Sequence, residues 1–325
     1  MSLITRRGTA AAASAASIAL LLAACSSSTG EESAAGSADA ETVTVEHAQG
    51  STEVPADPQR VVVLDFGALD TIDALGLGGD VVGLPLSSPV PDFLSAYEGE
   101  KYTDVGTLQE PDYEAIARLD PDLVVVGFRS AAAYPELAKT YPTVDVTFGY
   151  ANFLDEFGDS ARILGEIFGK EDEVEKGLAD IAAEAEQIRP LGEAAGAGMV
   201  LSTSGGEVTM YGEDSRFGPI FTELGVADAV SGVENTPHGE VVSFEMIRDT
   251  NPDWLFVNDR DAAVGQGEGA GQAAQQVLDN ELVASTTAWQ SEQVVYLDPQ
   301  RWYIAQHGLS NVAAMFDEVG QALGA

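Results

Sequence analysis

Three arginine residues stand where the sequence could build a binding site for an anion. Arg129 and Arg260 follow closely after apolar runs, and Arg216 lies in the Gly-containing loop Tyr211 to Gly218. Ligands of open α/β sheets bind beyond the carboxyl ends of the strands. A guanidinium group stays charged and donates several hydrogen bonds in one plane. These positions predict a site with three convergent cations, although each Arg could instead pair with a nearby Asp.

A histidine and a tyrosine add possible metal chemistry. His238 lies in a Pro-His-Gly loop, and Tyr303 comes shortly after the apolar run Val294 to Leu297. Imidazole and phenolate groups can both ligate iron. A single histidine is more often not a metal ligand, so the residues alone leave this interpretation open.

The composition excludes several other classes of protein. The 325 residues include 53 Asp and Glu against 15 Lys and Arg, giving a formal net charge of −38. Such a chain lacks the basic surface that nucleic acid binding requires. A single Cys rules out both a disulfide framework and a Cys-based zinc site. The sequence also contains no Gly-x-Ser-x-Gly elbow, phosphate-binding P-loop or His-Glu-x-x-His pattern.

The first residues are typical of an export signal. Arg6 and Arg7 precede an uncharged run of small and apolar residues that ends at Cys25. We interpret residues 1–24 as a signal peptide, by the general or the twin-arginine route, and Cys25 as the lipidated first residue of the mature chain. Residues 25–41 are then a flexible tether. A buried or free Cys25 is the alternative.

The body alternates short apolar runs with helical patterns, which predicts an α/β fold. The expected strands are 61–64, 81–84, 123–126, 144–146, 199–201, 254–257 and 294–297. The expected helices include 68–75, 113–119, 244–249 and 309–323.

An internal repeat indicates two related lobes. Residues 112–129 and 243–260 match at an offset of 131 with six identities in 18 positions, including Glu114 with Glu245 and Arg129 with Arg260. Between the copies runs a long helical stretch that is interrupted at Gly169 and is expected to end at Pro190. We therefore divide the body into an N-terminal lobe (42–151), a connecting helical segment (152–190) and a C-terminal lobe (191–325). A peripheral helix of one domain is the alternative.

Several stretches, in order, resemble one known family. They include RVVVLDFGALDTIDALGL, KYTDVGTLQEPDYEAIARLDPDLVVVG, YGEDSRFG, HGEVVSFEMI, NPDWLFVNDRDAAVG, VLDNELV and VVYLDPQRWYI. They are similar to the iron-siderophore substrate-binding lipoproteins of ABC importers, in the group that binds enterobactin-like and petrobactin-like catecholates. The resemblance covers nearly all of the mature body. It implies two Rossmann-like α/β lobes joined by a single long helix, with the ligand in the cleft between them.

The resemblance also implies roles for individual residues. Arg129, Arg216 and Arg260 would face a ferric siderophore, His238 and Tyr303 would complete the iron shell of a tetradentate ligand, and Glu114 and Glu245 would dock on the permease dimer. The chemistry of catechol rings adds that they can stack on guanidinium planes or on Trp302. The protein would be a monomer without enzymatic activity or cofactor, anchored by lipid to the outer face of the cell membrane. The sequence departs from the family in its acidity and in the loop 265–271, which looks enlarged.

Other ligands and functions remain open from the sequence. Haem, cobalamin or a hydroxamate siderophore could occupy the same kind of cleft, but these ligands account less well for three arginines. A lipid-anchored hydrolase or redox enzyme is the alternative of another class, and a purely structural surface lipoprotein is a third.

Overall fold

The computed structural model describes residues 41–234, 236, 238–265 and 273–325. The predicted signal peptide, Cys25, most of the tether and most of the loop 265–271 lie outside these residues. Among the described residues, no helix combines the length and the apolar composition that crossing a membrane would take.

The first sheet is parallel and buried on both faces. Its strand order is β5 (Thr103–Asp104), β4 (Val81–Leu84), β3 (Val61–Val63), β6 (Leu123–Val126) and β7 (Thr143–Asp145). Val61 and Val63 face one apolar cluster while Val62 faces another, and all three side chains are fully buried. Burial on both faces is why these strands read as continuous apolar runs.

The second sheet is mixed. Its order is β11 (Glu240–Val241), β9 (Glu207–Tyr211), β8 (Ala197–Ser204), β12 (Trp254–Asp259) and β13 (Val294–Leu297), with β10 (Ala227–Asp228) beside β8. Strands β8, β12 and β13 are parallel, and β9 is antiparallel to β8 and β11. All seven predicted strands are confirmed with small shifts at their ends.

Besides the two-residue strands β5, β10 and β11, two longer features of the β-structure were not predicted. A hairpin of β1 (Thr42–His47) and β2 (Gly50–Pro55) packs into the core through the buried Val45 and Val54 and the partly buried Val43, so its pattern is weakly apolar. Strand β9 follows a turn at Gly205 and Gly206, whose positive φ angles suit a tight hairpin.

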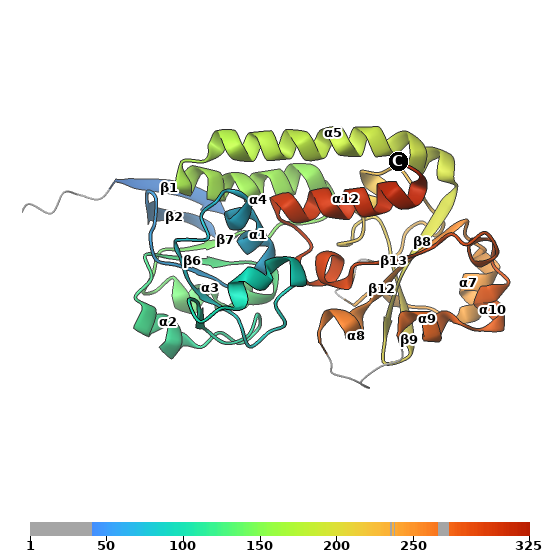
Figure 1. Ribbon diagram of the computed structural model, residues 1–325, viewed down its shortest axis with the longest axis horizontal. Helices are drawn as coiled ribbons and strands as arrows, with labels where there is room; N and C mark the ends of the chain where they lie inside the picture. The colour runs from blue at the N-terminus through green and yellow to red at the C-terminus, as the bar shows by residue number, and fades with distance from the viewer. Residues whose placement is uncertain (1–40, 235, 237, 266–272) are drawn as a thin grey trace, which may run out of the picture. The chain divides into compact units, whose positions relative to one another are not determined.

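The helices cover the sheets (Figure 1). The longer ones are α1 (Phe66–Ala74), α2 (Tyr113–Leu119), α4 (Phe153–Phe168), α5 (Glu171–Ala195), α7 (Phe244–Thr250) and α12 (Leu309–Leu323). The shorter ones are η1 (Asp92–Glu98), η2 (Phe128–Ala133), α3 (Tyr134–Leu137), α6 (Pro219–Thr222), α8 (Arg260–Ala263), α9 (Ala274–Leu278), α10 (Glu281–Ala284), α11 (Thr287–Gln290) and the π-helical turn η3 (Gln300–Ala305). The four helices predicted by range are confirmed.

The internal repeat is confirmed as a repeated helix–strand unit, α2–β6 and α7–β12. Asp112 and Ser243 cap the two helices at equivalent positions, each accepting from a backbone N–H of the first turn. Asp120 and Asn251 end the helices at the same offset, both with φ of 47°. A proline follows each of them and prevents the helix from continuing.

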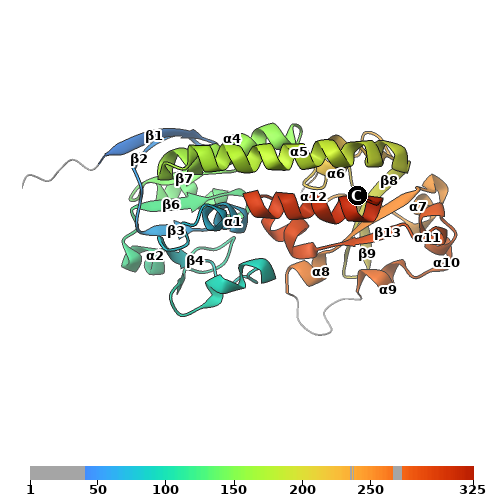
Figure 2. The same ribbon diagram turned by 45° about the horizontal axis from the view of Figure 1, so that its top comes forward.

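Helix α5 joins the two halves of the described chain. It packs against α4 and α12 and leads into β8, as both views show (Figures 1 and 2). The prediction that Pro190 ends this helix is wrong, because the helix continues to Ala195. Its last turn is held from outside: Trp254 Nε1 donates to the carbonyl of Ala195 over 3.1 Å. The fold class of two α/β lobes joined by a long helix is confirmed.

Gly192 makes that last turn possible, which gives a first prediction. A Cβ atom at residue 192 would lie 2.0 Å from the carbonyl oxygen of Leu224 and 2.9 Å from the N atom of Val226. Both are backbone atoms, so Gly192→Ala should lower the free energy of unfolding by about 1–3 kcal/mol in a urea titration. Gly79→Ala is the control, since nothing lies within 4 Å of a Cβ there. Equal stability of both variants would contradict close packing at the end of α5.

Candidate functional site

A cavity of about 600 Å³ lies where strands of both sheets end. Its wall includes residues that follow β6 and β7 in the first sheet and β12 and β13 in the second. The lining residues are Gln109, Phe128, Arg129, Thr147, Phe148, Tyr150, Tyr211, Ser215, Arg216, Thr236, His238, Arg260, Tyr303 and Gln306. Five of the six side chains predicted to bind a ligand are therefore in one cavity.

Three guanidinium groups surround the ring of Tyr303. The Cζ atoms of Arg129, Arg216 and Arg260 lie 5.2, 4.8 and 5.7 Å from the ring centroid. Each cation therefore lies within the range in which it is attracted to the ring electrons. Tyr303 itself is buried, with 6% of its surface exposed.

Hydrogen bonds hold the three arginines in place. Arg129 donates to the carbonyls of Tyr303 (2.5 Å) and Ile304 (3.0 Å), and Arg216 donates to the carbonyl of Tyr303 (3.3 Å). Arg260 donates from Nε to the Tyr303 hydroxyl and from Nη1 to the Ser204 hydroxyl, both over 2.8 Å. These acceptors are neutral, so the contacts orient the cations without cancelling their charge.

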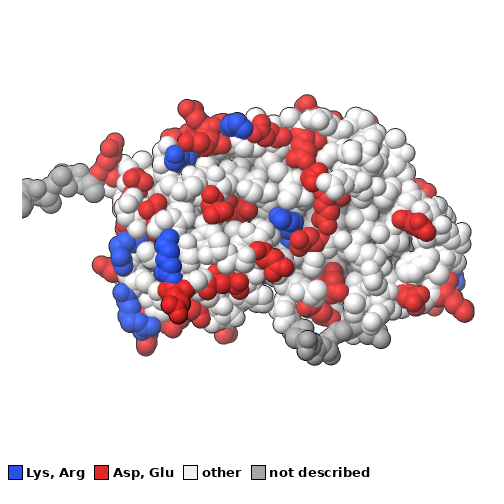
Figure 3. Space-filling model, viewed as in Figure 1, with Lys and Arg blue, Asp and Glu red and all other residues white. Residues whose placement is uncertain are grey.

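The electrostatics of Arg129 show how crowded the positive charge is. Burial lowers the pKa of Arg129, and the nearby charge of Arg216 lowers it further. Both effects disfavour the charged form, and an anion in the cavity would relieve both. The outer surface is different: acidic side chains are spread over the face in Figure 3, and basic ones gather mainly at its left end.

An aromatic wall, which the sequence analysis missed, lies beside the arginines. Phe128 packs edge to face on Phe148 at 5.1 Å and stacks on Tyr150 at 6.0 Å. All three follow β6 or β7 directly, which is the signal that singled out the arginines. The cavity therefore combines fixed positive charge with flat apolar surface.

His238 lies at the side of the cavity that opens toward a smaller pocket. That pocket has a volume of about 220 Å³ and shares Tyr211, His238 and Arg260 with the larger one. His238 itself is exposed. Across the described residues, no group of three or more His, Cys, Asp or Glu side chains is arranged to hold a metal ion. An iron ion at His238 and Tyr303 would need further ligands from the bound molecule.

The structure does not place Trp302 in the cavity, which corrects its predicted role. Its side chain is fully buried, its ring stacks on Phe217 at 6.2 Å, and its Nε1 donates to Glu318 over 2.8 Å. Trp302 and Tyr303 are adjacent in the π-helical turn, where neighbouring side chains point in different directions. Trp302 therefore lies in the core while Tyr303 lines the cavity. As a result, the Trp302 ring cannot stack on a ligand in the cavity.

The remaining predicted residues lie on the surface. Glu114 and Glu245 are exposed in the first turns of α2 and α7, the equivalent helices of the repeat. Arg162 and Arg248, which lie outside the cavity, pair with Glu175 and Asp249.

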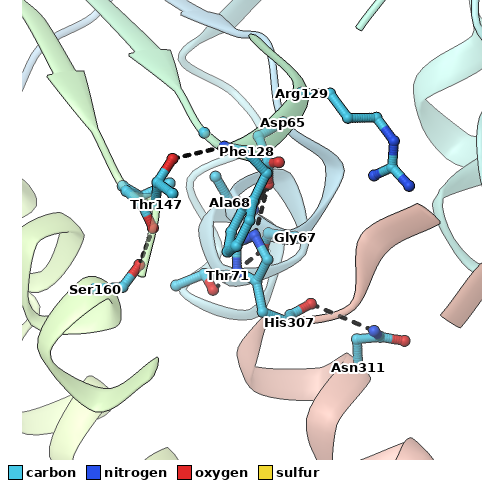
Figure 4. A network of polar contacts seen from close by, with 12 residues as sticks. Asp65, Gly67, Ala68, Thr71, Phe128, Arg129, Thr147, Ser160, His307 and Asn311 are labelled. Atoms are coloured by element: carbon cyan, nitrogen blue, oxygen red, sulfur yellow. Dashed lines mark hydrogen bonds and ion pairs between the residues drawn. The ribbon is translucent and has the colours of Figure 1, made fainter. Parts of the chain in front are cut away.

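A buried His–Asp pair lies below the aromatic wall (Figure 4). His307 Nε2 is 2.8 Å from Oδ1 of Asp65, which also caps α1 by accepting from Ala68 N over 2.9 Å. The His307 ring packs under Phe128 at 5.0 Å. A Cβ atom at Gly67 would lie 2.3 Å from this ring, so only glycine lets α1 approach so closely. The pair ties the start of α1 to the segment that follows Tyr303.

The fold and site together define a protein that binds a solute between two lobes. The sequence pattern of the periplasmic binding protein family matches residues 61–301, and the chain belongs to this family. Its members are extracytoplasmic binding proteins.

Individual relatives agree with this assignment. The chain is 38% identical to the petrobactin-binding protein YclQ of Bacillus subtilis over 87% of its own length and 89% of that protein. The YclQ crystal structure matches with a TM-score of 0.83, covering 88% of this chain and 99% of that one. The catecholate-siderophore-binding protein VctP of Vibrio cholerae is 36% identical with a TM-score of 0.77, covering 85% and 99%. The ferric-anguibactin-binding protein FatB of Vibrio anguillarum is 31% identical over 85% of this chain and 86% of that protein.

The His307–Asp65 pair gives the second prediction. Replacing His307 by Ala leaves the Asp65 carboxylate buried without its partner, which should lower the free energy of unfolding at neutral pH by about 3–5 kcal/mol. The measurement is urea unfolding of His307→Ala, with Asp65→Asn and the double variant alongside. The double variant should lose less than the sum of the two single losses.

The pH dependence tests the same pair. Burial alone would raise the Asp65 pKa, but the charge and hydrogen bond of His307 and the bond from Ala68 outweigh it and leave the pKa below its ordinary value of 3.8. The carboxylate therefore stabilises the fold above pH 3.8, and this contribution is lost as the pH falls through the lower folded pKa. The stability difference between wild type and Asp65→Asn should shrink over that range. A difference that does not change with pH would contradict the pairing.

Proposed function

We propose that this protein captures a ferric siderophore of the catecholate type in the cavity and delivers it to the permease of an ABC importer. The observation that carries the proposal is the convergence of Arg129, Arg216 and Arg260 around Tyr303 beside an aromatic wall. Three relatives are named for binding petrobactin, ferric anguibactin and catecholate siderophores, which supports the same ligand class.

The chemistry of the ligand matches that of the cavity. A ferric tris-catecholate carries a charge of −3, and burying such an anion requires compensating positive charge. Its flat rings can lie against Phe128 and Phe148 and against the guanidinium planes. The protein's own charge of −38 opposes the approach of an anion, but at about 0.15 M salt this repulsion is screened beyond about 8 Å.

With a siderophore that has only four donor atoms, His238 and Tyr303 would supply the two missing iron ligands. A tetradentate siderophore leaves two positions on the iron open, and an imidazole with a phenolate can fill them. The hydroxyl oxygen of Tyr303 accepts from Arg260 Nε over 2.8 Å, which fixes the position of this possible iron ligand. If the siderophore supplies all six iron ligands, His238 and Tyr303 would only line the cavity.

The proposal includes the way the protein is held and used. Residues 1–24 are removed, Cys25 carries the lipid, and the tether to residue 41 leads to lobes at 42–151 and 191–325 that the segment 152–190 connects. The protein works as a lipid-anchored monomer on the outer face of the cell membrane. Glu114 and Glu245 meet basic residues of the permease dimer.

Arg216→Ala tests the site. Losing one charged donor should weaken binding of a ferric tris-catecholate by about 1–3 kcal/mol. The binding is measured by titration with the ligand, using the quenching of tryptophan fluorescence as the signal. The matched control is Arg248→Ala, which removes an arginine that pairs with Asp249 on the surface. A ferric hydroxamate, which lacks the negative charge, should bind wild type poorly. Unchanged affinity in Arg216→Ala would remove this residue from the site, and a wild type that ignores every catecholate would refute the ligand class.

Glu114 and Glu245 test the docking role. The double variant Glu114→Ala with Glu245→Ala should bind the ligand as wild type does, because neither side chain lines the cavity. Uptake of radioactive iron by cells that depend on this protein should stop. Exposed acids elsewhere, such as Glu136 and Glu186, provide a control pair of the same charge. Normal uptake with the first pair replaced would exclude these residues from docking.

A further inference from the structure

A chain of three hydrogen bonds connects the cavity to an acid outside it. Arg260 donates from Nε to the Tyr303 hydroxyl and from Nη1 to the Ser204 hydroxyl, both over 2.8 Å. The same Ser204 hydroxyl donates to Oδ1 of Asp261 over 2.9 Å. Asp261 itself is not among the residues that line the cavity or the smaller pocket beside it. It therefore belongs to the support of the site and not to its wall.

The Asp261 carboxylate is held in place independently of the arginine. Its Oδ2 atom accepts from the backbone N of Gly205 over 2.7 Å. Gly205 lies in the turn between β8 and β9, and Ser204 is the last residue of β8. Asp261 lies in α8, which begins directly after β12, the strand that pairs with β8. Two neighbouring strands thus fix the positions of the hydroxyl and the carboxylate.

The Ser204 hydroxyl separates two opposite charges. Arg260 and Asp261 are neighbours in sequence, yet within the described chain no direct ion pair joins their side chains, and both bond to the hydroxyl instead. The oxygen accepts from the cation while the hydrogen is donated to the carboxylate, so one group satisfies both. The pKa of Arg260 is raised, first by its hydrogen bond to Tyr303 and to a smaller extent by the charge of Asp261. Since no Asp or Glu is among the residues that line the cavity in the described chain, the guanidinium keeps its charge for a ligand.

We propose that Ser204 is a positioning residue, which keeps Arg260 available to an anionic ligand by standing between it and Asp261. This inference rests on the proposed function and adds a residue that its site requires. Without the hydroxyl, the guanidinium loses an acceptor and the carboxylate loses a donor at the same time. Charged groups left without partners are costly, so the two would pair directly and Arg260 would turn away from Tyr303. The cavity would then present two cations instead of three.

The test is a double-variant cycle, titrated with a ferric tris-catecholate. Ser204→Ala should weaken binding about tenfold or more, the value of one hydrogen bond to a charged group. Asp261→Asn should bind within about twofold of wild type, because the amide can still accept from Gly205 and leaves the hydroxyl to Arg260. In the double variant no carboxylate competes for Arg260, so the affinity should return to within about threefold of wild type.

Two further variants separate the hydroxyl from the fold. Ser204→Thr keeps the hydroxyl and suits a strand, so it should bind the ligand as wild type does. Ser285→Ala makes the change of Ser204→Ala at an exposed position far from the cavity lining and should leave the affinity unchanged. Thermal melts of all variants accompany the titrations, so that a loss of binding can be told from a loss of folded protein.

The outcomes are distinguishable. Unchanged affinity in Ser204→Ala would overturn the positioning role while the proposed function stands. A double variant that binds as weakly as Ser204→Ala would overturn it too, because a hydroxyl that touches the ligand directly could not be replaced by removing the acid. Failure of wild type to bind the ferric complex would overturn the proposed function and this inference together.

Discussion

Three like charges held around one aromatic ring are the constraint on which this structure depends. Guanidinium groups repel one another, and at Arg129 burial and the neighbouring charge of Arg216 together lower the pKa. Tyr303 offsets this repulsion. Its ring attracts all three cations, its hydroxyl accepts from Arg260, and its backbone carbonyl accepts from Arg129 and Arg216. An anion bound in the cavity would also offset this repulsion, so the arrangement suits an anionic ligand.

The rest of the fold keeps that ring and those charges in place. Arg129 is fixed at the end of β6, and Arg260 at the end of β12, by strands buried on both faces. Tyr303 comes from a π-helical turn, which is an unusual backbone that often marks functional sites. Helix α1 secures the chain beyond this turn through Asp65 and Asp70. The two sheets therefore meet at a site that neither could form alone.

Much of this could be predicted from the sequence, and the reasons for the failures are physical. Buried parallel strands such as Leu123–Val126 are apolar on both faces and were recognised, whereas the hairpin β1–β2 buries only alternate side chains and was not. The arginines were found because basic residues are scarce in so acidic a chain and these three follow apolar strands or lie in a loop. Pro190 was misread, since tertiary contacts at Trp254 override its tendency to end a helix.

The site itself shows where such reasoning stops. Neighbours in sequence do not share surroundings, so Trp302 was assigned to the cavity although it lies in the core. His307 and Asp65 are 242 residues apart, and nothing in either stretch indicates the other. The positive φ angle of Gln306 (46°) could not be predicted either, because glutamine has no preference for the left-handed region.

The most direct test is to vary the charge of the ligand while its shape stays constant. One hexadentate tris-catecholate forms a complex of charge −3 with Fe³⁺ and a nearly identical complex of charge −2 with Ti⁴⁺. If three guanidinium groups recognise the ligand by charge, wild type should bind the ferric complex at least about tenfold more tightly, and Arg216→Ala should narrow that ratio. Equal affinity for the two complexes in wild type would contradict recognition by matched charge.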